Sequence, residues 1–242
     1  MKYKLASLLA STLILTNSVF ADTTINFNSE VHAFTQDEKQ LITNIVNRTE
    51  QSVRDLLPSL TEEITFNIVT TNRNLDIVGG ATGRADAPGV IELTLSTASK
   101  DGISGAANSA LTSSVYHELH HLVRGWTITQ NKYGAQHGIP VAVVNEGLAS
   151  IFAETYTDEY FAAAYDYPEQ AAVWLDEIMQ LPLDANYNHW VSGFHPDGRT
   201  VIGYRIGRYV VHEAMRKTGK DILELSEMTP SAILAVVLDR SE

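Results

Sequence analysis

Residues 117–121 read His117-Glu118-Leu119-His120-His121, a run with three of the chain's eight histidines. Residues four apart share one face of an α-helix, so His117 and His121 can present two imidazole nitrogens to one metal ion. Glu118 is the next residue round the helix after His117, so its side chain can reach water beside the ion without binding the ion. Zinc lowers the pKa of water from about 15.7 to about 7, and a neighbouring carboxylate can collect the proton. The stretch therefore predicts a zinc-dependent hydrolytic site, in which His120 points elsewhere and has a structural or surface role.

The sequence that follows supplies a third ligand for such a site. Periodicity predicts one helix over about 106–124 and a second over about 141–157, separated by a glycine-containing loop. Near the start of the second helix lies Glu146, which would complete a set of two histidines and one carboxylate with His117 and His121. This set leaves the fourth tetrahedral position of zinc open, which is typical of catalytic zinc sites. The alternative is a solvated helix face that carries these residues by chance.

The motifs HELHH at 117–121 and NEGLA at 145–149 resemble those of the zinc metallopeptidases whose third ligand is a glutamate, the gluzincins. They are most similar to a small family of predicted zinc-dependent proteases of unknown function (DUF2268-like), and the segment 202–207 resembles that family too. The resemblance covers roughly residues 60–240. It implies an α+β, zincin-like fold, in which a small N-terminal twisted sheet packs on the active-site helix and a helical C-terminal lobe lies across the cleft.

The resemblance also implies a role for each site residue. His117, His121 and Glu146 would bind one Zn²⁺ ion. Glu118 would act as general base. Tyr204, from the C-terminal lobe, would stabilise the oxyanion of a tetrahedral intermediate, although its helical spacing is also typical of a core position.

Several details of the resemblance remain open. His195, in a loop, and His212, on a helix, are alternatives to Tyr204 as the oxyanion donor. Ser150 occupies the position where many gluzincins have an acid that orients a ligating histidine, and a hydroxyl orients more weakly. In such enzymes the strand before the active-site helix pairs with an extended peptide, and residues 90–96 occupy that place.

Elsewhere the patterns predict strands in the first half of the chain and helices in the second. Thr35 and Glu38 form a capping box at the start of a helix that ends before Pro58. Alternating apolar residues predict strands at 64–68 and 91–95. Between these strands a flexible turn is predicted at 79–83, and the later chain is predicted to form helices over about 168–180, 200–217 and 231–239 with an irregular loop over 183–199.

Composition favours one globular domain over residues 22–242, with an N-lobe over about 22–126 and a helical C-lobe over about 127–242. Hydrophobic residues make up 44% and charged residues 19% of the chain, which argues against disorder. The formal net charge of -12 argues against nucleic acid or an anionic membrane surface as the main partner. The absence of cysteine excludes disulfides, thiolate metal sites and thiol nucleophiles.

Residues 1–21 have the form of a signal peptide. Lys2 and Lys4 precede an apolar run of about 12 residues, and Val19-Phe20-Ala21 is typical of a cleavage site. The run is shorter than the roughly 20 residues that span a bilayer, although an uncleaved anchor is the alternative. No later run is apolar enough to span a membrane. The sequence therefore predicts export to a bacterial periplasm or the medium.

Together these features predict an exported zinc metallopeptidase that hydrolyses peptide bonds in a peptide or protein substrate. Two alternatives remain: a catalytically silent module that binds metal or a partner, and a hydrolase of amides other than peptides. The sequence leaves the cleavage specificity, the choice between endo- and exopeptidase, and the oligomeric state open.

Overall fold

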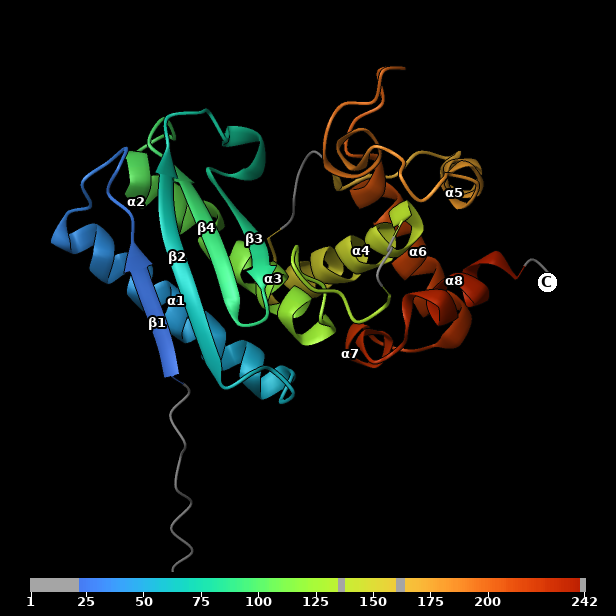
Figure 1. The fold of residues 1–242 in the computed structure, drawn as a ribbon, viewed down its shortest axis with the longest axis horizontal. Helices are drawn as coiled ribbons and strands as arrows, with labels where there is room; N and C mark the ends of the chain where they lie inside the picture. The colour runs from blue at the N-terminus through green and yellow to red at the C-terminus, as the bar shows by residue number, and fades with distance from the viewer. Residues whose placement is uncertain (1–21, 135–137, 160–163, 240–242) are drawn as a thin grey trace, which may run out of the picture.

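The computed structural model describes residues 22–134, 138–159 and 164–239, and the predicted signal peptide lies outside them. A small sheet with its covering helices forms one half of the molecule, and helices form the other half (Figure 1). The N-terminal half contains β1 (Asp22–Phe27), α1 (Gln36–Leu56), β2 (Glu63–Thr71), the 3₁₀ turn η1 (Asp76–Val78), β3 (Ala81–Ala87), β4 (Val90–Ser96), α2 (Gly102–Ala106), the π-helical turn η2 (Ala107–Leu111) and α3 (Thr112–Arg124). The C-terminal half contains α4 (Gly138–Thr157), α5 (Ala171–Met179), the π-helical turn η4 (Asn188–Ser192), α6 (Ile202–Thr218), α7 (Ile222–Ser226) and α8 (Pro230–Leu238).

This arrangement confirms the predicted α+β class with a small mixed sheet at the N-terminus. The capping box is present, since the Thr35 side chain accepts a hydrogen bond from the Glu38 backbone and the Glu38 side chain accepts one from Thr35. Both predicted strands form, and in β2 buried residues alternate with half-buried ones because one face of the strand meets the core. The sequence analysis did not identify β1 or α7.

The sheet has the order β1-β2-β4-β3, in which β1, β2 and β4 are parallel and β3 is antiparallel to β4. The prediction that Val90–Ser96 pairs with a peptide is therefore wrong, because β4 has a strand on each side. The predicted flexible turn at 79–83 is wrong in its second part, where β3 begins. The sequence of β3 is small and polar, yet Ala81 and Ala85 are buried and β4 supplies the pairing. Strand β3, and not β4, is the edge nearest the motif helix.

The motif helix is the third part of a nearly continuous helical run over residues 102–124. The π-helical turn η2 lies in this run just before the motif helix. Gly125 ends the motif helix with a left-handed backbone (φ 57°) that favours glycine. Helix α3 contacts α1, β3 and β4 on the sheet side and α4 on the other side. The motif residues therefore lie at the junction of the two halves.

Helices α4 and α6 are in backbone contact. A Cβ atom at Gly147 would lie 2.3 Å from the carbonyl oxygen of Gly207, and one at Gly207 would lie 2.5 Å from that of Val143. Neither position can therefore carry a side chain without separating the helices. Helix α4 begins at Gly138, so that Glu146 lies within its third turn, further from the start of the helix than predicted. Among the described residues, no helix combines the length and apolar character needed to cross a membrane.

Candidate active site

Helices α3 and α4 bring the three predicted ligands together. The Nε2 atoms of His117 and His121 are 3.0 Å apart, and Glu146 Oε2 lies 3.2 Å from the first and 3.4 Å from the second. His121 and Glu146 are buried, whereas His117 is partly exposed. Burial alone would raise the pKa of the Glu146 carboxyl, but the neighbouring His121 and His117 hold that pKa well below its usual range.

The donor set fits a zinc ion. Zinc binds histidine nitrogen and carboxylate oxygen at about 2.0–2.2 Å with tetrahedral angles, which places the ligand atoms about 3.4 Å from one another. The three observed separations are close to this value. Two neutral imidazoles and one carboxylate are also the donor types that catalytic zinc sites use. Among the described residues this is the one group of three that could hold a metal ion.

Glu118 lies beside this cluster and is enclosed by β3. Its side chain is buried, and it accepts a hydrogen bond from the backbone N–H of Ala85. A Cβ atom at Gly83 would lie 2.4 Å from Cγ of Glu118, so only glycine allows β3 to approach so closely. Burial raises the pKa of Glu118 to about 7. A carboxyl group with this pKa exchanges protons readily near neutral pH.

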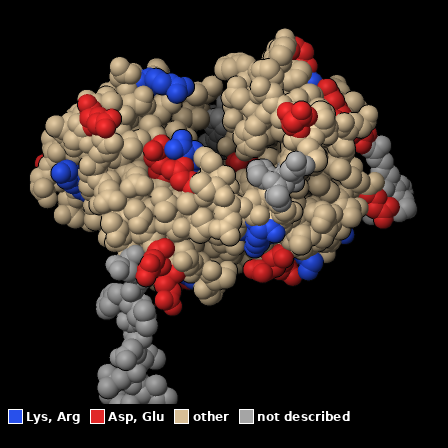
Figure 2. Space-filling model, in the orientation of Figure 1, with Lys and Arg blue, Asp and Glu red and all other residues tan. Residues whose placement is uncertain are grey.

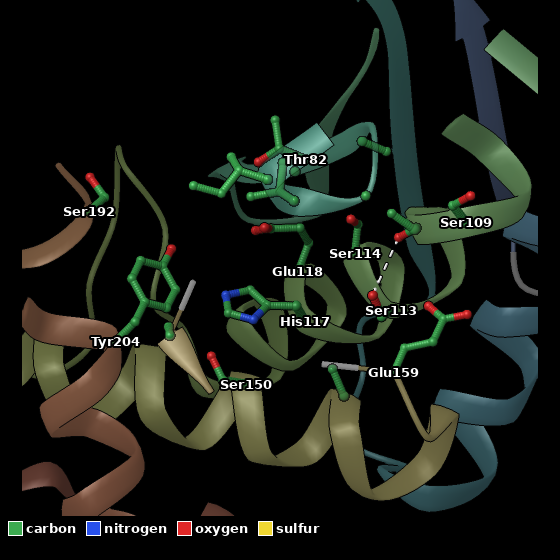
Figure 3. A pocket seen from close by; sticks show the side chains of 18 of the residues that line it. Thr82, Ser109, Ser113, Ser114, His117, Glu118, Ser150, Glu159, Ser192 and Tyr204 are labelled. Atoms are coloured by element: carbon green, nitrogen blue, oxygen red, sulfur yellow. Dashed lines mark hydrogen bonds between the residues drawn. The ribbon is translucent and has the colours of Figure 1, made fainter. Parts of the chain in front are cut away.

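Tyr204 lies on the other side of the cluster, at the first turn of α6. Its ring centroid is 6.1 Å from that of His117, and its hydroxyl hydrogen-bonds Glu146. Burial and the nearby Glu146 carboxylate raise the pKa of Tyr204 well above its usual range, so the phenol stays protonated and can donate. Figure 3 shows Glu118, His117 and Tyr204 around one space below Thr82. The structure therefore brings all five predicted site residues together.

Tyr187, which the sequence analysis did not identify, contacts the third ligand. Its hydroxyl donates a hydrogen bond to Glu146 Oε1 at 3.1 Å, which leaves Oε2 facing the histidines. It lies just before η4, in the segment predicted to be an irregular loop. Only the folded loop brings this tyrosine to the site, and no local pattern in the sequence indicates it.

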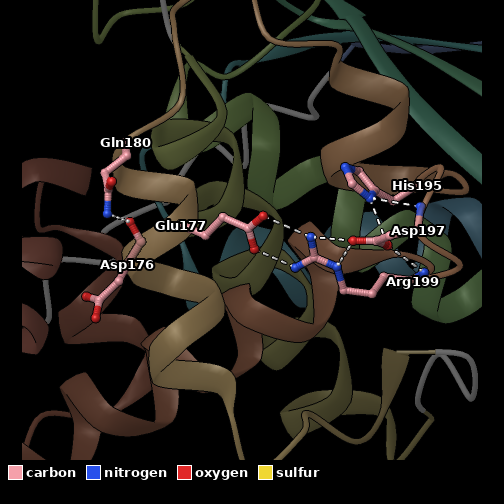
Figure 4. A network of polar contacts seen from close by, with 6 residues as sticks. All are labelled: Asp176, Glu177, Gln180, His195, Asp197 and Arg199. Atoms are coloured by element: carbon pink, nitrogen blue, oxygen red, sulfur yellow. Dashed lines mark hydrogen bonds and ion pairs between the residues drawn. The ribbon is translucent and has the colours of Figure 1, made fainter.

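The two alternative histidines are away from the site. His195 Nδ1 pairs with Asp197 at 2.8 Å, and its ring lies tilted against Trp190 with the centroids 4.5 Å apart. It is at one end of a network in which Arg199 joins Asp197 to Glu177 (Figure 4). His212 lies on α6 against Tyr167. Neither lines the cavity beside the predicted ligands. The structure thus favours Tyr204 over both as a donor at this site.

His120 has the structural role that its direction on the helix predicts. It is fully buried, and its Nε2 lies 2.8 Å from the hydroxyl of Ser226 on α7. Arg124, one turn further along α3, donates to the carbonyl oxygens of Ser226 and Met228 and to Asn145 Oδ1. These contacts hold α3, α4 and α7 together behind the ligands.

In many gluzincins an acidic side chain orients a ligating histidine, and within the described ranges no such side chain bonds Nδ1 of His121. The Nδ1 atom of His121 is buried and has no hydrogen-bond partner among the described residues. Ser150, at the position where an acid is usual, instead lines the cavity. The orientation of the His121 ring therefore depends on packing more than on a hydrogen bond.

A cavity of about 490 Å³ adjoins the site. It is bounded by β3, by the N-terminal turns of the motif helix, by α4 and by α6, and Figure 2 shows the surface hollowed between the two halves of the molecule. Its size is in the range of small-molecule and side-chain binding pockets. His117, Glu118 and Tyr204 thus face a space large enough for part of a peptide.

Comparison with known proteins agrees with this geometry. The family described as "Predicted Zn-dependent protease (DUF2268)" matches residues 36–235, which include every site residue named above. No curated protein and no solved structure matches the chain. The match covers most of the chain, and the chain belongs to this family of predicted zinc-dependent proteases.

Proposed function

We propose that this protein is a zinc metallopeptidase of the gluzincin type, exported from the cell, that hydrolyses peptide bonds with Glu118 as general base. The observation that carries the proposal is the placement of Glu118 beside the His117, His121 and Glu146 cluster, at the mouth of a cavity. Metal binding alone does not require a buried carboxyl group beside the ligands. Export is proposed from the signal-like sequence of residues 1–21.

His117, His121 and Glu146 would hold the ion, which when bound would lower the pKa of water and polarise the substrate carbonyl. Glu118 would take the proton of the attacking water and deliver it to the leaving amine. Its pKa of about 7 suits both transfers. Tyr204 would turn its O–H from Glu146 to the carbonyl oxygen and donate a hydrogen bond there as negative charge develops. Tyr187 would keep Glu146 oriented through its hydrogen bond to Oε1.

The edge of β3 would bind the substrate backbone. The carbonyl oxygen of Gly80 accepts from the Ser96 N–H at the end of β4, whereas the carbonyl oxygen of Ala85 faces outward and accepts from the Ile128 N–H. Gly83 therefore presents its N–H and C=O away from the sheet, next to Glu118. Among the described residues, no backbone group outside the β3–β4 ladder forms a hydrogen bond with these two groups. An extended peptide that pairs with Gly83 would place a carbonyl group beside Glu118.

Metal analysis and peptide cleavage of the purified protein test the proposal. We expect about one equivalent of zinc and cleavage of a mixture of unstructured peptides, followed by mass spectrometry. A chelator should abolish cleavage, and added zinc should restore it. Zinc without cleavage would favour the silent binding module instead. Cleavage of amides in cell-wall fragments, but not of peptides, would favour the non-proteolytic hydrolase.

Gly83→Ala should reduce turnover without removing the metal. The added methyl group would overlap Cγ of Glu118, so β3 or the carboxyl group must move. A displacement of about 1 Å at a catalytic group can cost on the order of 100-fold, and we expect a loss of 10- to 100-fold in kcat. The measurement is kcat with zinc content determined on the same sample. Arg84→Lys, on the same strand but with an exposed side chain that does not line the cavity, is the matched control for β3 itself.

A further inference from the structure

The cavity runs from the predicted ligands along the groove between α3 and α4. One wall carries His117, Ser113 and Ser109, which follow one another at intervals of four residues along the helical run. The opposite wall carries Ser150 and Ala153 of α4. The serine and alanine side chains on both walls are small, and they leave the groove between the helices open. Each interval along α3 corresponds to about 6 Å, so the groove is deep enough to hold a long side chain.

A carboxylate lies at the far end of this groove. Glu159, just after α4, lines the cavity, and its carboxylate accepts a hydrogen bond from the backbone N–H of Ser113. The Ser113 hydroxyl lies beside the same carboxylate, and its hydrogen bond in Figure 3 goes to the carbonyl oxygen of Ala110. The Oε2 atom of Glu159 is buried and has no hydrogen-bond partner among the described residues. Burial raises the pKa of Glu159, although the polar groups of Ser113 beside it act in the opposite direction. A buried acceptor of this kind is stabilised when a cationic donor is brought to it.

The charges around the cavity favour a cation as that donor. Arg208 also lines the cavity, but its guanidinium is paired with Glu154 and lies 5.0 Å from the ring centroid of Tyr165. Asp76 adds a further acid on the sheet side of the cavity. Since the charge of Arg208 is already compensated, the carboxylate of Glu159 dominates the end of the groove.

We propose that this groove is the specificity pocket of the enzyme and that Glu159 selects a lysine or arginine side chain of the substrate. Ser113, which contacts Glu159, lies one helical turn, about 6 Å, from His117. The four methylene groups of lysine extend roughly 6 Å, so the ammonium group of a residue next to the scissile bond reaches Glu159. Val78, Ala110 and Ala153 supply apolar surface for the methylene groups. This inference rests on the proposed peptidase function.

Peptide binding to a protein that does not cleave provides the test. Zinc-loaded Glu118→Gln protein is titrated by calorimetry with two blocked pentapeptides, each of alanine with lysine or norleucine at the centre. An alanine peptide can shift along the cleft, so the central side chain can enter the groove from either side of the scissile bond. We expect the lysine peptide to bind at least about 10-fold more tightly, as a charge-assisted hydrogen bond in a buried site provides.

Glu159→Gln, introduced into the Glu118→Gln protein, should reduce the ratio of the affinities for the lysine and norleucine peptides to near one. Asp158→Asn is the matched control, since it removes the same charge from the neighbouring exposed residue and asparagine tolerates the left-handed backbone at that position (φ 57°). Asp158→Asn should leave the ratio of the two peptide affinities unchanged. Glu159→Lys should reverse the preference, so that a glutamate peptide binds more tightly than a glutamine peptide.

Equal binding of the lysine and norleucine peptides would overturn the inference, as would a ratio that Glu159→Gln leaves unchanged or the failure of both peptides to bind. Cleavage by the wild-type protein separates this result from the proposed function. Cleavage of a peptide mixture without preference for basic residues contradicts only the pocket assignment. Tight binding of the lysine peptide without any cleavage supports the pocket and contradicts the peptidase function.

Discussion

Glu118→Gln should retain about one equivalent of zinc and lose turnover by at least about 100-fold, the lower end of general-base contributions. Glutamine keeps the size of the side chain and can still accept the hydrogen bond from the Ala85 backbone, so the fold and β3 should not change. It cannot accept the proton of the attacking water. The measurement is kcat on a cleaved peptide, with metal content and the circular dichroism spectrum from the same preparation.

Glu92→Gln provides a control for the loss of one carboxylate near the same sheet edge. Glu92 lies on β4 and pairs with Arg84 at 3.3 Å, and it does not line the cavity. Its substitution should change kcat by less than about twofold, as expected for surface changes. If Glu118→Gln cleaves as fast as the wild type, another residue activates the water and the role given to Glu118 is wrong.

His117→Ala should cost most of the zinc affinity and, with it, all measurable cleavage. The substitution removes one of three ligand atoms and leaves His121 and Glu146 unable to complete the site. Loss of a residue that only orients a ligand weakens binding by about 10- to 100-fold, so loss of the ligand itself should cost more than about 100-fold. Competition with a chromophoric chelator measures the affinity directly, independently of turnover.

His195→Ala is the matched control, because it removes a histidine that pairs with Asp197 outside the cavity. It should bind zinc as the wild type does. Full zinc occupancy in His117→Ala would show that the metal is bound elsewhere. Loss of zinc in both variants would indicate a general loss of folding, which thermal unfolding of each variant would reveal.

The motif helix and its partner were predictable because their signals are local. Helical spacing alone places His117 and His121 on one face, and it does not depend on the rest of the fold. Glu146 follows within a second strongly apolar segment that can only be buried, and it therefore packs against the first helix. For these residues the sequence predicts the juxtaposition that the structure shows.

The sheet edge and the far end of the cavity were not predictable in this way. β3 is rich in small and polar residues, and it is a strand because β4 pairs with it, which is a non-local cause. Tyr187 and Glu159 reach the site from chain segments whose course is determined by tertiary packing. A loop residue carries no periodicity from which its direction can be inferred.

The backbone contact between Gly147 and Gly207 fixes two residues of the proposed active site relative to each other. Gly147 adjoins Glu146, and Gly207 lies one turn after Tyr204, so the contact locks the carboxylate and the phenol into a single rigid body. No intervening side chain can change rotamer and let them drift apart. For the proposed peptidase this would be preorganisation: the Tyr204 ring and the Glu146 carboxylate keep their separation as charge develops, and the conformational entropy of fixing them is lost on folding and not during the reaction.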